Sequence, residues 1–165
     1  MDGSLMTAFD PSTDALAFRQ ALGSFTTGVT IITTDSAEGP VAIVANSFAS
    51  VSLDPPLVLW SPAKSSRRFE HFAGSRRFAI HVMSADQEDI CREVIASKTA
   101  INQIPHTLSH CGMPLIIGAL ATFECSLDAT HDAGDHVIIV GRVTRAHHQS
   151  GTPLTFHAGQ YGTLA

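Results

Sequence analysis

Short apolar runs rich in β-branched residues follow one another along most of this chain, with turn residues rather than helices between most of them. Each run has the length and composition of a strand, and some alternate apolar with polar positions. The runs lie at residues 29–34, 41–45, 57–60, 77–83, 119–127, 137–146, 154–156 and 161–164. Parallel strands need long crossover connections, whereas antiparallel neighbours are joined by short turns. The sequence therefore predicts a mainly β fold with short helices, built as an antiparallel, Greek-key-like barrel.

Three segments carry helix signals. They are residues 10–23, with Asp10 as N-cap, Pro11 at the first position and Gly23 at the end; a short helix capped by Ser65 or Ser66 and closed by Gly74; and a helix that follows the capping box Ser84–Gln87 and runs to Ser97. The run at 77–83 alternates apolar and polar residues and predicts a half-buried strand. Residues 99–114 show no clear periodicity and predict a loop. The segment that begins at Asn46 is expected to extend the strand before it.

Composition limits the classes of protein that this chain can represent. Its 165 residues suit one domain, residues 1–165, with residues 1–9 as a disordered tail. Only 15% of residues are charged, against about 25% in a typical protein, so we expect a second subunit to cover part of the surface of a homodimer. A net charge of −5 argues against nucleic acid as a partner. No apolar run reaches the roughly 18 residues that cross a bilayer, so we expect no membrane partner.

Cysteine usage and the N-terminal residues indicate a compartment. The chain has three cysteines, widely spaced and without a Cys-x-x-Cys pair, which is typical of a reducing environment. Asp2 and Asp10 stand where a secretory leader would carry basic residues. These features predict a cytoplasmic protein.

Residues 46–56 place small hydroxyl and amide side chains between two predicted strands and end at Pro55-Pro56. Such a segment offers hydrogen-bonding groups on a rigid support, which suits a flat polar ligand. Ser65, Ser66 and Arg67 follow at a predicted helix start, where hydroxyls, backbone N–H groups and a guanidinium can bind phosphate. The two segments predict a phosphate-bearing cofactor. A Rossmann site is not indicated, because no Gly-x-Gly-x-x-Gly follows a strand.

Several motifs stand in an order that resembles the flavin reductase-like family, the small reductase component of two-component flavin monooxygenases. The resemblance covers residues 18–164, and the second and fourth motifs are specific in combination. The motifs are Phe25-x-x-Gly28-Val29; Asn46-Ser47-Phe48-x-Ser50-Val51-Ser52-Leu53-x-Pro55-Pro56-Leu57; Gly112-x-Pro114-x-x-x-Gly118 with Cys125; Gly134-Asp135-His136; and Gly159-x-Tyr161.

The resemblance implies a fold, an activity and partners. The fold is the FMN-binding split barrel, usually a homodimer with flavin near the subunit interface. The activity is that of an NAD(P)H:flavin oxidoreductase, which transfers hydride from NADH or NADPH to FMN or FAD. Reduced flavin then passes to a partner monooxygenase. The choices between NADH and NADPH and between FMN and FAD stay open, with FMN favoured for a short single domain.

Roles for individual residues also follow from the resemblance. Backbone N–H groups of residues 45–47 and 61–63 would face the isoalloxazine edge, and His136 would position the nicotinamide without acting as an acid or base. An Arg-Phe-Ala-like segment found in many members is replaced here by residues 95–99, in which Lys98 supplies the cation. The predicted flavin-binding residues are Ala45, Asn46, Ser47, Phe48, Ser61, Pro62, Ala63, Ser65, Ser66, Arg67 and Lys98. The predicted NAD(P)H-binding residues are Gly134, Asp135, His136 and Tyr161.

Four other interpretations compete with a reductase. The chain could be a flavin-binding carrier or sensor without NADH turnover, or a flavoenzyme that keeps its FMN and reduces another acceptor. A metal site was weighed at His106 and His110, with Cys111 adjacent, but Pro105 makes this segment loop-like and no carboxylate lies nearby in sequence. The sequence therefore predicts no metal. A hydrolase lacks support because there is no Gly-x-Ser-x-Gly motif.

Overall fold

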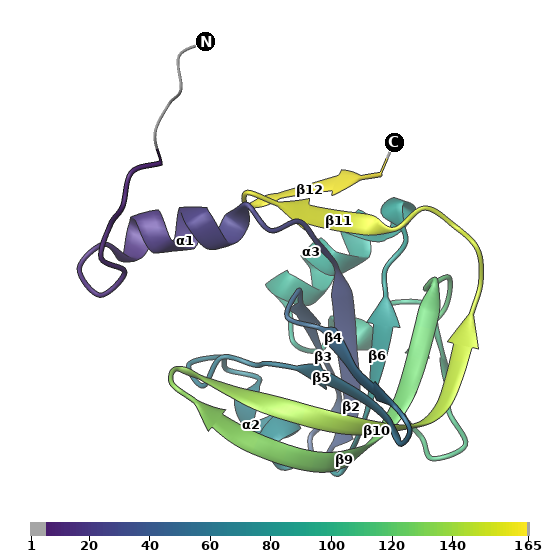
Figure 1. Cartoon of the computed structure of the whole chain (residues 1–165). Helices are drawn as coiled ribbons and strands as arrows, with labels where there is room; N and C mark the ends of the chain where they lie inside the picture. The colour runs from purple at the N-terminus through teal and green to yellow at the C-terminus, as the bar shows by residue number, and fades with distance from the viewer. Residues whose placement is uncertain (1–5, 165) are drawn as a thin grey trace.

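The computed structural model describes residues 6–164, so the predicted tail at residues 1–9 lies partly outside the described residues. Figure 1 shows a strongly curved sheet with helices at its ends. In chain order the elements are α1 (Ala15–Gly23), β1 (Thr27–Gly28), β2 (Thr30–Ser36), β3 (Gly39–Ala45), β4 (Ala49–Leu53), β5 (Pro56–Trp60), α2 (Phe69–Ala73), β6 (Arg77–Val82), η1 (Ala85–Gln87), α3 (Glu88–Ala96), η2 (Ala100–Asn102), β7 (His106–Leu108), β8 (Pro114–Ile116), β9 (Ala121–Ala133), β10 (His136–His148), β11 (Leu154–His157) and β12 (Gln160–Thr163).

The main sheet has seven strands in the order β3-β2-β6-β9-β10-β5-β4, and each neighbouring pair is antiparallel. Its two edge strands, β3 and β4, are separated in the chain by residues 46–48 alone. Four Cα–Cα steps span at most about 15 Å, so the sheet must curl until its edges approach each other. The result is a barrel with a seam at residues 46–48. The prediction of an antiparallel, mainly β barrel is confirmed.

The connection from β5 to β6 gives the barrel its Greek-key-like order. It carries α2 and skips two strands of the sheet, β10 and β9. Two smaller sheets complete the fold, β1-β11-β12 and β7-β8. Among the described residues, no helix is both long and apolar enough to cross a membrane.

Buried side chains form two clusters, one on each face of the main sheet. Ile31 and Ile32 are neighbours on β2 and belong to different clusters, as expected for successive residues of a strand. The Ile32 cluster is centred on Trp60, which makes edge contacts with Phe72 and Phe78 at ring separations of 5.1 and 6.1 Å. The Ile31 cluster lies between the sheet and α3. Both faces of the central strands are therefore covered.

This double cover makes the prediction of a half-buried strand at residues 77–83 wrong. β6 lies between β2 and β9 and is buried on both sides, so its alternating polar residue His81 is fully buried. The His81 Nδ1 lies 2.9 Å from the carbonyl oxygen of Ile31. Burial lowers the His81 pKa to about 4, so the ring is neutral at physiological pH.

Two predicted helix starts are also wrong, although the helices exist. The Asp10 carboxylate accepts hydrogen bonds from the backbone N–H and hydroxyl of Ser12, and this local turn delays the helix. α1 instead begins after Asp14, whose side chain accepts from Ala17 N at 2.9 Å, and it ends at Gly23 as predicted. α2 begins after Arg68 without a side-chain cap, not at Ser65 or Ser66. The capping box predicted for Ser84–Gln87 is present, and it opens η1 and α3.

Three segments near the barrel differ from the expected strands and loops. β3 ends at Ala45 and β4 begins as a separate strand at Ala49, so residues 46–48 do not extend β3. β9 and β10 pair up to a tip at Gly134 and Asp135, so they extend beyond the predicted strands at residues 119–127 and 137–146. Gly134 has φ +69°, a conformation that glycine adopts without strain. The predicted loop at 99–114 holds η2 and β7 and reaches β8.

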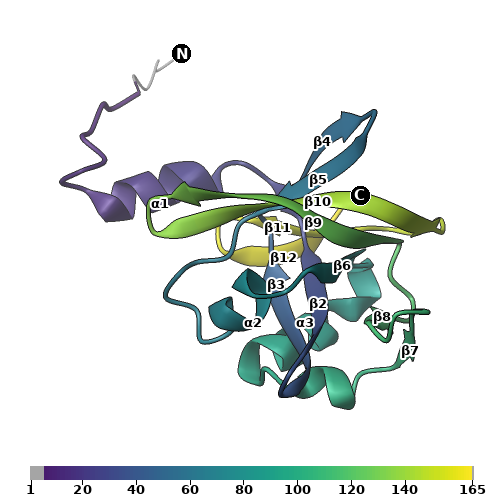
Figure 2. The same cartoon turned by 90° about the horizontal axis from the view of Figure 1, so that it is seen from below.

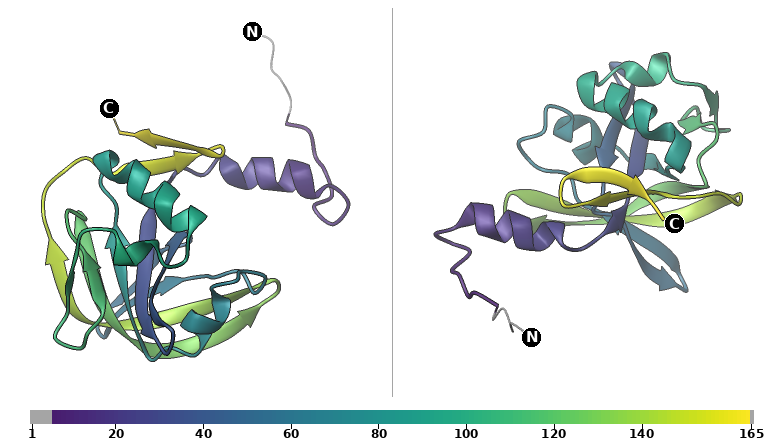
Figure 3. Two further views of the ribbon diagram at one scale, coloured as in Figure 1. Left: turned by 180° about the vertical axis from the view of Figure 1, so that it is seen from behind. Right: turned by 90° about the horizontal axis from the view of Figure 1, so that it is seen from above.

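α1 extends away from the barrel, as two views show (Figures 1 and 3). None of its residues is buried, and its apolar side chains Phe18 and Leu22 are 43% and 59% exposed. The β4–β5 hairpin also projects from the body (Figure 2), with Leu53 at its end 96% exposed. The described chain thus leaves apolar groups on two protruding elements in contact with solvent.

Gly141 on β10 offers a test of the barrel packing. A Cβ placed there would lie 2.6 Å from Phe78 Cζ and 3.0 Å from Cys125 Cβ, both in the barrel core. We expect Gly141→Ala to lower the free energy of unfolding by about 1–3 kcal/mol, the usual cost of overpacking. Chemical denaturation would measure this change. Gly28→Ala is the matched control, because a Cβ at Gly28 meets nothing within 4 Å. Equal stability of the two variants would contradict the packing described here.

Candidate active site

A pocket of about 350 Å³ opens at the barrel seam. Three segments that are distant in sequence meet there: the end of β3 with the seam residues, the end of β5 with the loop after it, and the start of β10. Its lining residues are Ile43, Val44, Ala45, Asn46, Ser47, Trp60, Ser61, Pro62, Ala63, Ser66, Arg68, Ile95 and His136. Eight of these are among the predicted site residues, so the fold brings most of the predicted set together.

Ser47 joins the two sides of the seam. Its hydroxyl donates to the carbonyl oxygen of Ser61 at 3.2 Å and accepts from the Ser61 N–H at 2.9 Å. The side chain is therefore used within the protein and is not free for a ligand. Its two hydrogen bonds fix the seam residues against the end of β5.

The seam leaves backbone donors for a ligand. The N–H groups of Asn46, Ser47 and Ala63 have no acceptor among the described residues. The sequence predicted donors at all of residues 61–63, but the Ser61 N–H donates to the Ser47 hydroxyl and Pro62 has no N–H. Ala63 is therefore the donor of that group.

The loop after β5 is fastened to the tip of the β9–β10 hairpin. Val137 N donates to Pro62 O at 3.1 Å, and Lys64 N donates to Asp135 O at 2.9 Å. The Lys64 ammonium also donates to the carbonyl oxygen of Gly134 at 2.6 Å and pairs with Asp132. These contacts hold the start of β10, and with it His136, at the pocket.

His136 is half-exposed and hydrogen-bonded on one side. Its Nδ1 lies 2.7 Å from Asp135 Oδ1, and this contact with His136 lowers the pKa of the Asp135 carboxyl. The carboxylate fixes the ring and favours a proton on Nδ1, which leaves Nε2 for a ligand. Gly134 and Asp135 form the hairpin tip and do not line the pocket.

The positive charge at the pocket comes from Arg68, whereas the sequence predicted Arg67. Arg67 and Ser65 are exposed and lie outside the lining, while Ser66 lies within it. The Arg68 guanidinium donates to the carbonyl oxygens of Val94 and Ile95 at the end of α3. Partial burial lowers the Arg68 pKa, and its Nε is buried without a partner among the described residues.

Three other predicted residues lie elsewhere. Phe48 stacks on Phe123, with ring centroids 5.8 Å apart. Lys98 binds Glu38 at 3.0 Å beside the β2–β3 hairpin, at the end of β3 opposite the seam, and lowers the pKa of that carboxyl. Tyr161 lines an adjoining hollow of about 210 Å³ that shares Val44, Ala45, Asn46 and Ile95 with the seam pocket.

Sequence reasoning missed Trp60 as a pocket residue. Its ring is fully buried, and its Nε1 has no partner among the described residues. A buried indole N–H usually finds an acceptor, so its absence beside a pocket marks a place for a ligand or water. The available signal was its position, since Trp60 directly precedes the predicted Ser61.

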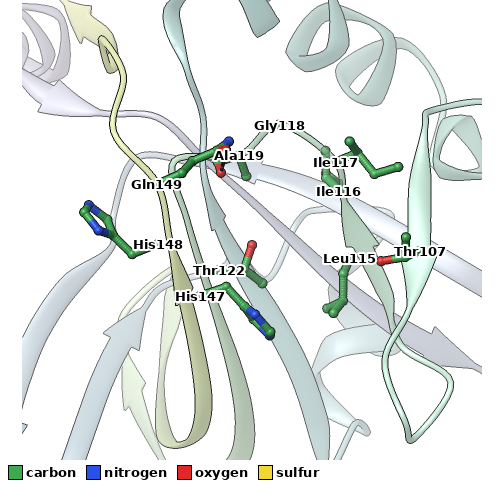
Figure 4. A pocket seen from close by; sticks show the side chains of 10 residues that line it. All are labelled: Thr107, Leu115, Ile116, Ile117, Gly118, Ala119, Thr122, His147, His148 and Gln149. Atoms are coloured by element: carbon green, nitrogen blue, oxygen red, sulfur yellow. Dashed lines mark hydrogen bonds between the residues drawn. The ribbon is translucent and has the colours of Figure 1, made fainter.

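A second hollow of about 260 Å³ lies at the other end of β10 (Figure 4). It is lined by residues of β7, β8 and the ends of β9 and β10, including Thr122, His147 and His148. None of the predicted flavin or nucleotide residues lies in it. The seam pocket is therefore the candidate active site.

Residues 22–165 match the family model described as the flavin reductase like domain. The chain belongs to this family. It is 53% identical over 149 residues to FMN reductase (NADH) SmoA of Agrobacterium fabrum. The aligned residues cover 90% of this chain and 86% of that protein. It is 41% identical over 150 residues to the flavin-dependent monooxygenase reductase subunit HsaB of Rhodococcus jostii, covering 90% and 77%.

Solved structures share the fold. NADH:FAD oxidoreductase SgcE6 of Streptomyces globisporus, in complex with NAD and FAD fragments, matches with a TM-score of 0.89 and 33% identity over 97% of this chain and 98% of that one. Nitrilotriacetate monooxygenase component B of Mycobacterium thermoresistibile matches with a TM-score of 0.88 and 35% identity, covering 94% and 89%. The likeness to these flavin reductase relatives confirms the predicted fold class.

Proposed function

We propose that this protein is an NADH-dependent flavin reductase that reduces FMN, or FAD, and supplies the reduced flavin to a partner monooxygenase. The observation that carries the proposal is the seam pocket, where free backbone N–H groups and His136 face one cavity. NADH is the expected donor because the relative with 53% identity is named FMN reductase (NADH). The monooxygenase partner is expected because HsaB is named as the reductase subunit of a flavin-dependent monooxygenase.

The residues of the pocket fit a flavin. A cavity of about 350 Å³ falls in the range of roughly 300–1,000 Å³ that small-ligand sites occupy. Trp60 Nε1 and Arg68 Nε lie beside it, buried and without acceptors among the described residues. Donors in excess of acceptors suit a ligand that carries carbonyl and phosphate oxygens. Asn46, Ser47 and Ala63 would face the ring edge, with Ser66 and Arg68 toward the phosphate.

When both ligands are bound, the nicotinamide supplies a hydride and solvent supplies a proton to the flavin: NADH + H⁺ + FMN gives NAD⁺ and FMNH₂. The protein's contribution is position and field. The free backbone N–H groups of Asn46, Ser47 and Ala63 stabilise negative charge at the edge of the flavin ring that they would face. His136, held by Asp135, offers Nε2 to the nicotinamide carboxamide and fixes its orientation. No side chain needs to act as a nucleophile.

The proposal includes a homodimer in the cytoplasm. The uncovered apolar side chains of α1 and of the β4–β5 hairpin, together with the low charge content, support a second subunit. The three cysteines are free, which supports a reducing compartment. A single match over residues 22–165 supports one domain.

Adding FMN to the purified protein with NADH should cause rapid oxidation of NADH. The measurement is the fall in absorbance at about 340 nm, which reports the loss of the reduced nicotinamide. The same assay with FAD and with NADPH ranks the substrates. A flavin carrier would bind FMN without this turnover, and a flavoenzyme with retained FMN would turn over without added flavin. Either result would overturn the proposed function.

His136→Ala tests the nicotinamide role within this assay. We expect the KM for NADH to rise at least several-fold, because the ring that orients the carboxamide is lost. His131→Ala is the matched control, since His131 is exposed on β9 and does not line the pocket. Unchanged kinetics in His136→Ala would remove His136 from the site.

Substituting Arg67 and Arg68 one at a time tests which of them is the pocket cation. Arg68 lines the pocket, whereas the sequence predicted Arg67. We expect Arg68→Gln to weaken FMN binding about tenfold, because a charged donor beside the pocket contributes roughly 1.5–3 kcal/mol. Arg67→Gln should change the dissociation constant less than about twofold, as expected for a solvated surface charge. Quenching of FMN fluorescence measures both. A larger effect of Arg67→Gln would restore the original assignment.

Light scattering should give twice the chain mass of 17.5 kDa. Phe18 and Leu22 are four apart on one face of α1, so Leu22→Glu places a charge on the apolar face and should give a monomer. Gln20→Glu adds the same carboxylate on the polar face and should leave the dimer intact. A monomeric wild-type protein would refute the dimer.

A further inference from the structure

A cluster of metal-binding side chains lies on the main sheet at the far end of β10 from His136. His110, Cys111 and Glu124 place one potential ligand atom each within 4.8 Å of one another. His147 holds the Glu124 carboxylate in place, because its Nε2 lies 3.0 Å from Glu124 Oε1. We propose that His110, Cys111 and Glu124 form a binding site for one zinc ion, with His147 positioning the carboxylate.

Glu124 is the group that points to a ligand. Its side chain is only 3% exposed, and Oε2 is buried without a hydrogen-bond partner among the described residues. A buried carboxylate needs compensation on both oxygens, because removing its charge from water is costly. His147 compensates Oε1 alone. A divalent cation at Oε2 would complete the site.

The sheet and the β7–β8 turn each supply part of the cluster. On the ladder, His147 of β10 lies opposite Thr122 of β9, and Glu124 is two residues further along β9 on the same face. Figure 4 shows His147 and His148 projecting to opposite sides of β10, with His147 on the side of Leu115 in β8. Arg145 is opposite Glu124 in the ladder, but no ion pair joins them among the described residues.

The turn that carries His110 and Cys111 is held in place by its own hydrogen bonds. Ser109 N donates to Met113 O at 2.9 Å, and the Ser109 hydroxyl accepts from Met113 N at 3.0 Å. Met113 is buried, and Pro114 O accepts from the buried Thr33 hydroxyl at 2.7 Å. The two potential ligands are therefore presented by an anchored turn, with Cys111 Sγ 3.7 Å from His110 Nε2.

The donor types select the metal. One thiolate, one imidazole and one carboxylate match zinc, whereas magnesium and calcium prefer oxygen ligands alone. Ligand atoms around tetrahedral zinc lie about 3.4–3.8 Å apart, so the cluster need contract by only about 1 Å. His110 is exposed and Cys111 half-buried, which gives the ion a path from solvent. Three protein ligands leave one tetrahedral position for solvent.

Sequence reasoning paired the wrong histidine with this turn. His106 lies on β7, where its Nδ1 is 2.8 Å from Ile104 O, and it is not part of the cluster. The carboxylate that was missing near His110 in sequence comes from β9, and the imidazole that hydrogen-bonds to it comes from β10. The prediction of no metal rested on sequence distance, which the fold removes.

Titration of the untagged full chain with Zn²⁺, in competition with a chromophoric chelator, tests the site. We expect one zinc per chain, with Cys111→Ser and Glu124→Gln each weakening binding at least about tenfold. Zinc at 100 times its dissociation constant should raise the Tm of the wild type by roughly 5–10 °C. Co²⁺ should give a thiolate charge-transfer band that Cys111→Ser abolishes. Circular dichroism checks that both variants fold, and Cys111 lies on a surface turn where serine fits.

His131→Ala is the matched control and should bind zinc as the wild type does. Absence of stoichiometric binding would overturn the proposal. So would binding that Cys111→Ser leaves unchanged, or that His131→Ala weakens equally, since scattered surface histidines would then hold the ion. NADH-dependent flavin reduction should continue after zinc removal, which separates this test from that of the proposed function.

Discussion

Closure of the sheet through residues 46–48 is the constraint on which the rest of the structure depends. So short a segment between the two edge strands forces the seam to be narrow, and the hydrogen bonds between Ser47 and Ser61 hold it. The same short segment cannot continue either strand, so its backbone N–H groups are left unpaired by the sheet. A barrel closed in this way creates unsatisfied donors at one place on its rim. The candidate active site is a direct consequence of how the sheet closes.

The β9–β10 hairpin connects this seam with the opposite end of the barrel. One end of β10 begins with His136 at the pocket, and the other carries His147 beside Glu124. Its long ladder makes the hairpin the most extensively paired part of the sheet. A zinc ion at Glu124 would fasten the β7–β8 turn to that ladder and stabilise the fold without entering the chemistry at His136.

Local sequence signals predicted six of the seven strands of the main sheet and the capping box at Ser84–Gln87, because strand composition and capping act between neighbours in the chain. These signals failed where residues distant in sequence determine the burial or the direction of a side chain. The alternating pattern predicted that His81 faces solvent, but β6 lies between β2 and β9 and His81 is buried. Arg67 and Arg68 are equivalent in sequence, and only the start of α2 after Arg68 decides which one turns toward the pocket. The Glu124 cluster depends on contacts between two strands, β9 and β10, and the β7–β8 turn, which no local pattern encodes.

The way Arg68 is used bears on how firmly the pocket could hold a flavin. Its guanidinium already donates to the carbonyl oxygens of Val94 and Ile95, so only part of its hydrogen-bonding capacity remains for a phosphate. Arg67 and Lys98, the other cations predicted for the site, are directed to solvent and to Glu38. Recognition of a flavin at this site would then rest mainly on the backbone N–H groups of Asn46, Ser47 and Ala63. Such a site would favour the flat ring over the charged tail, and weak phosphate contacts would allow a reduced flavin to leave for another protein.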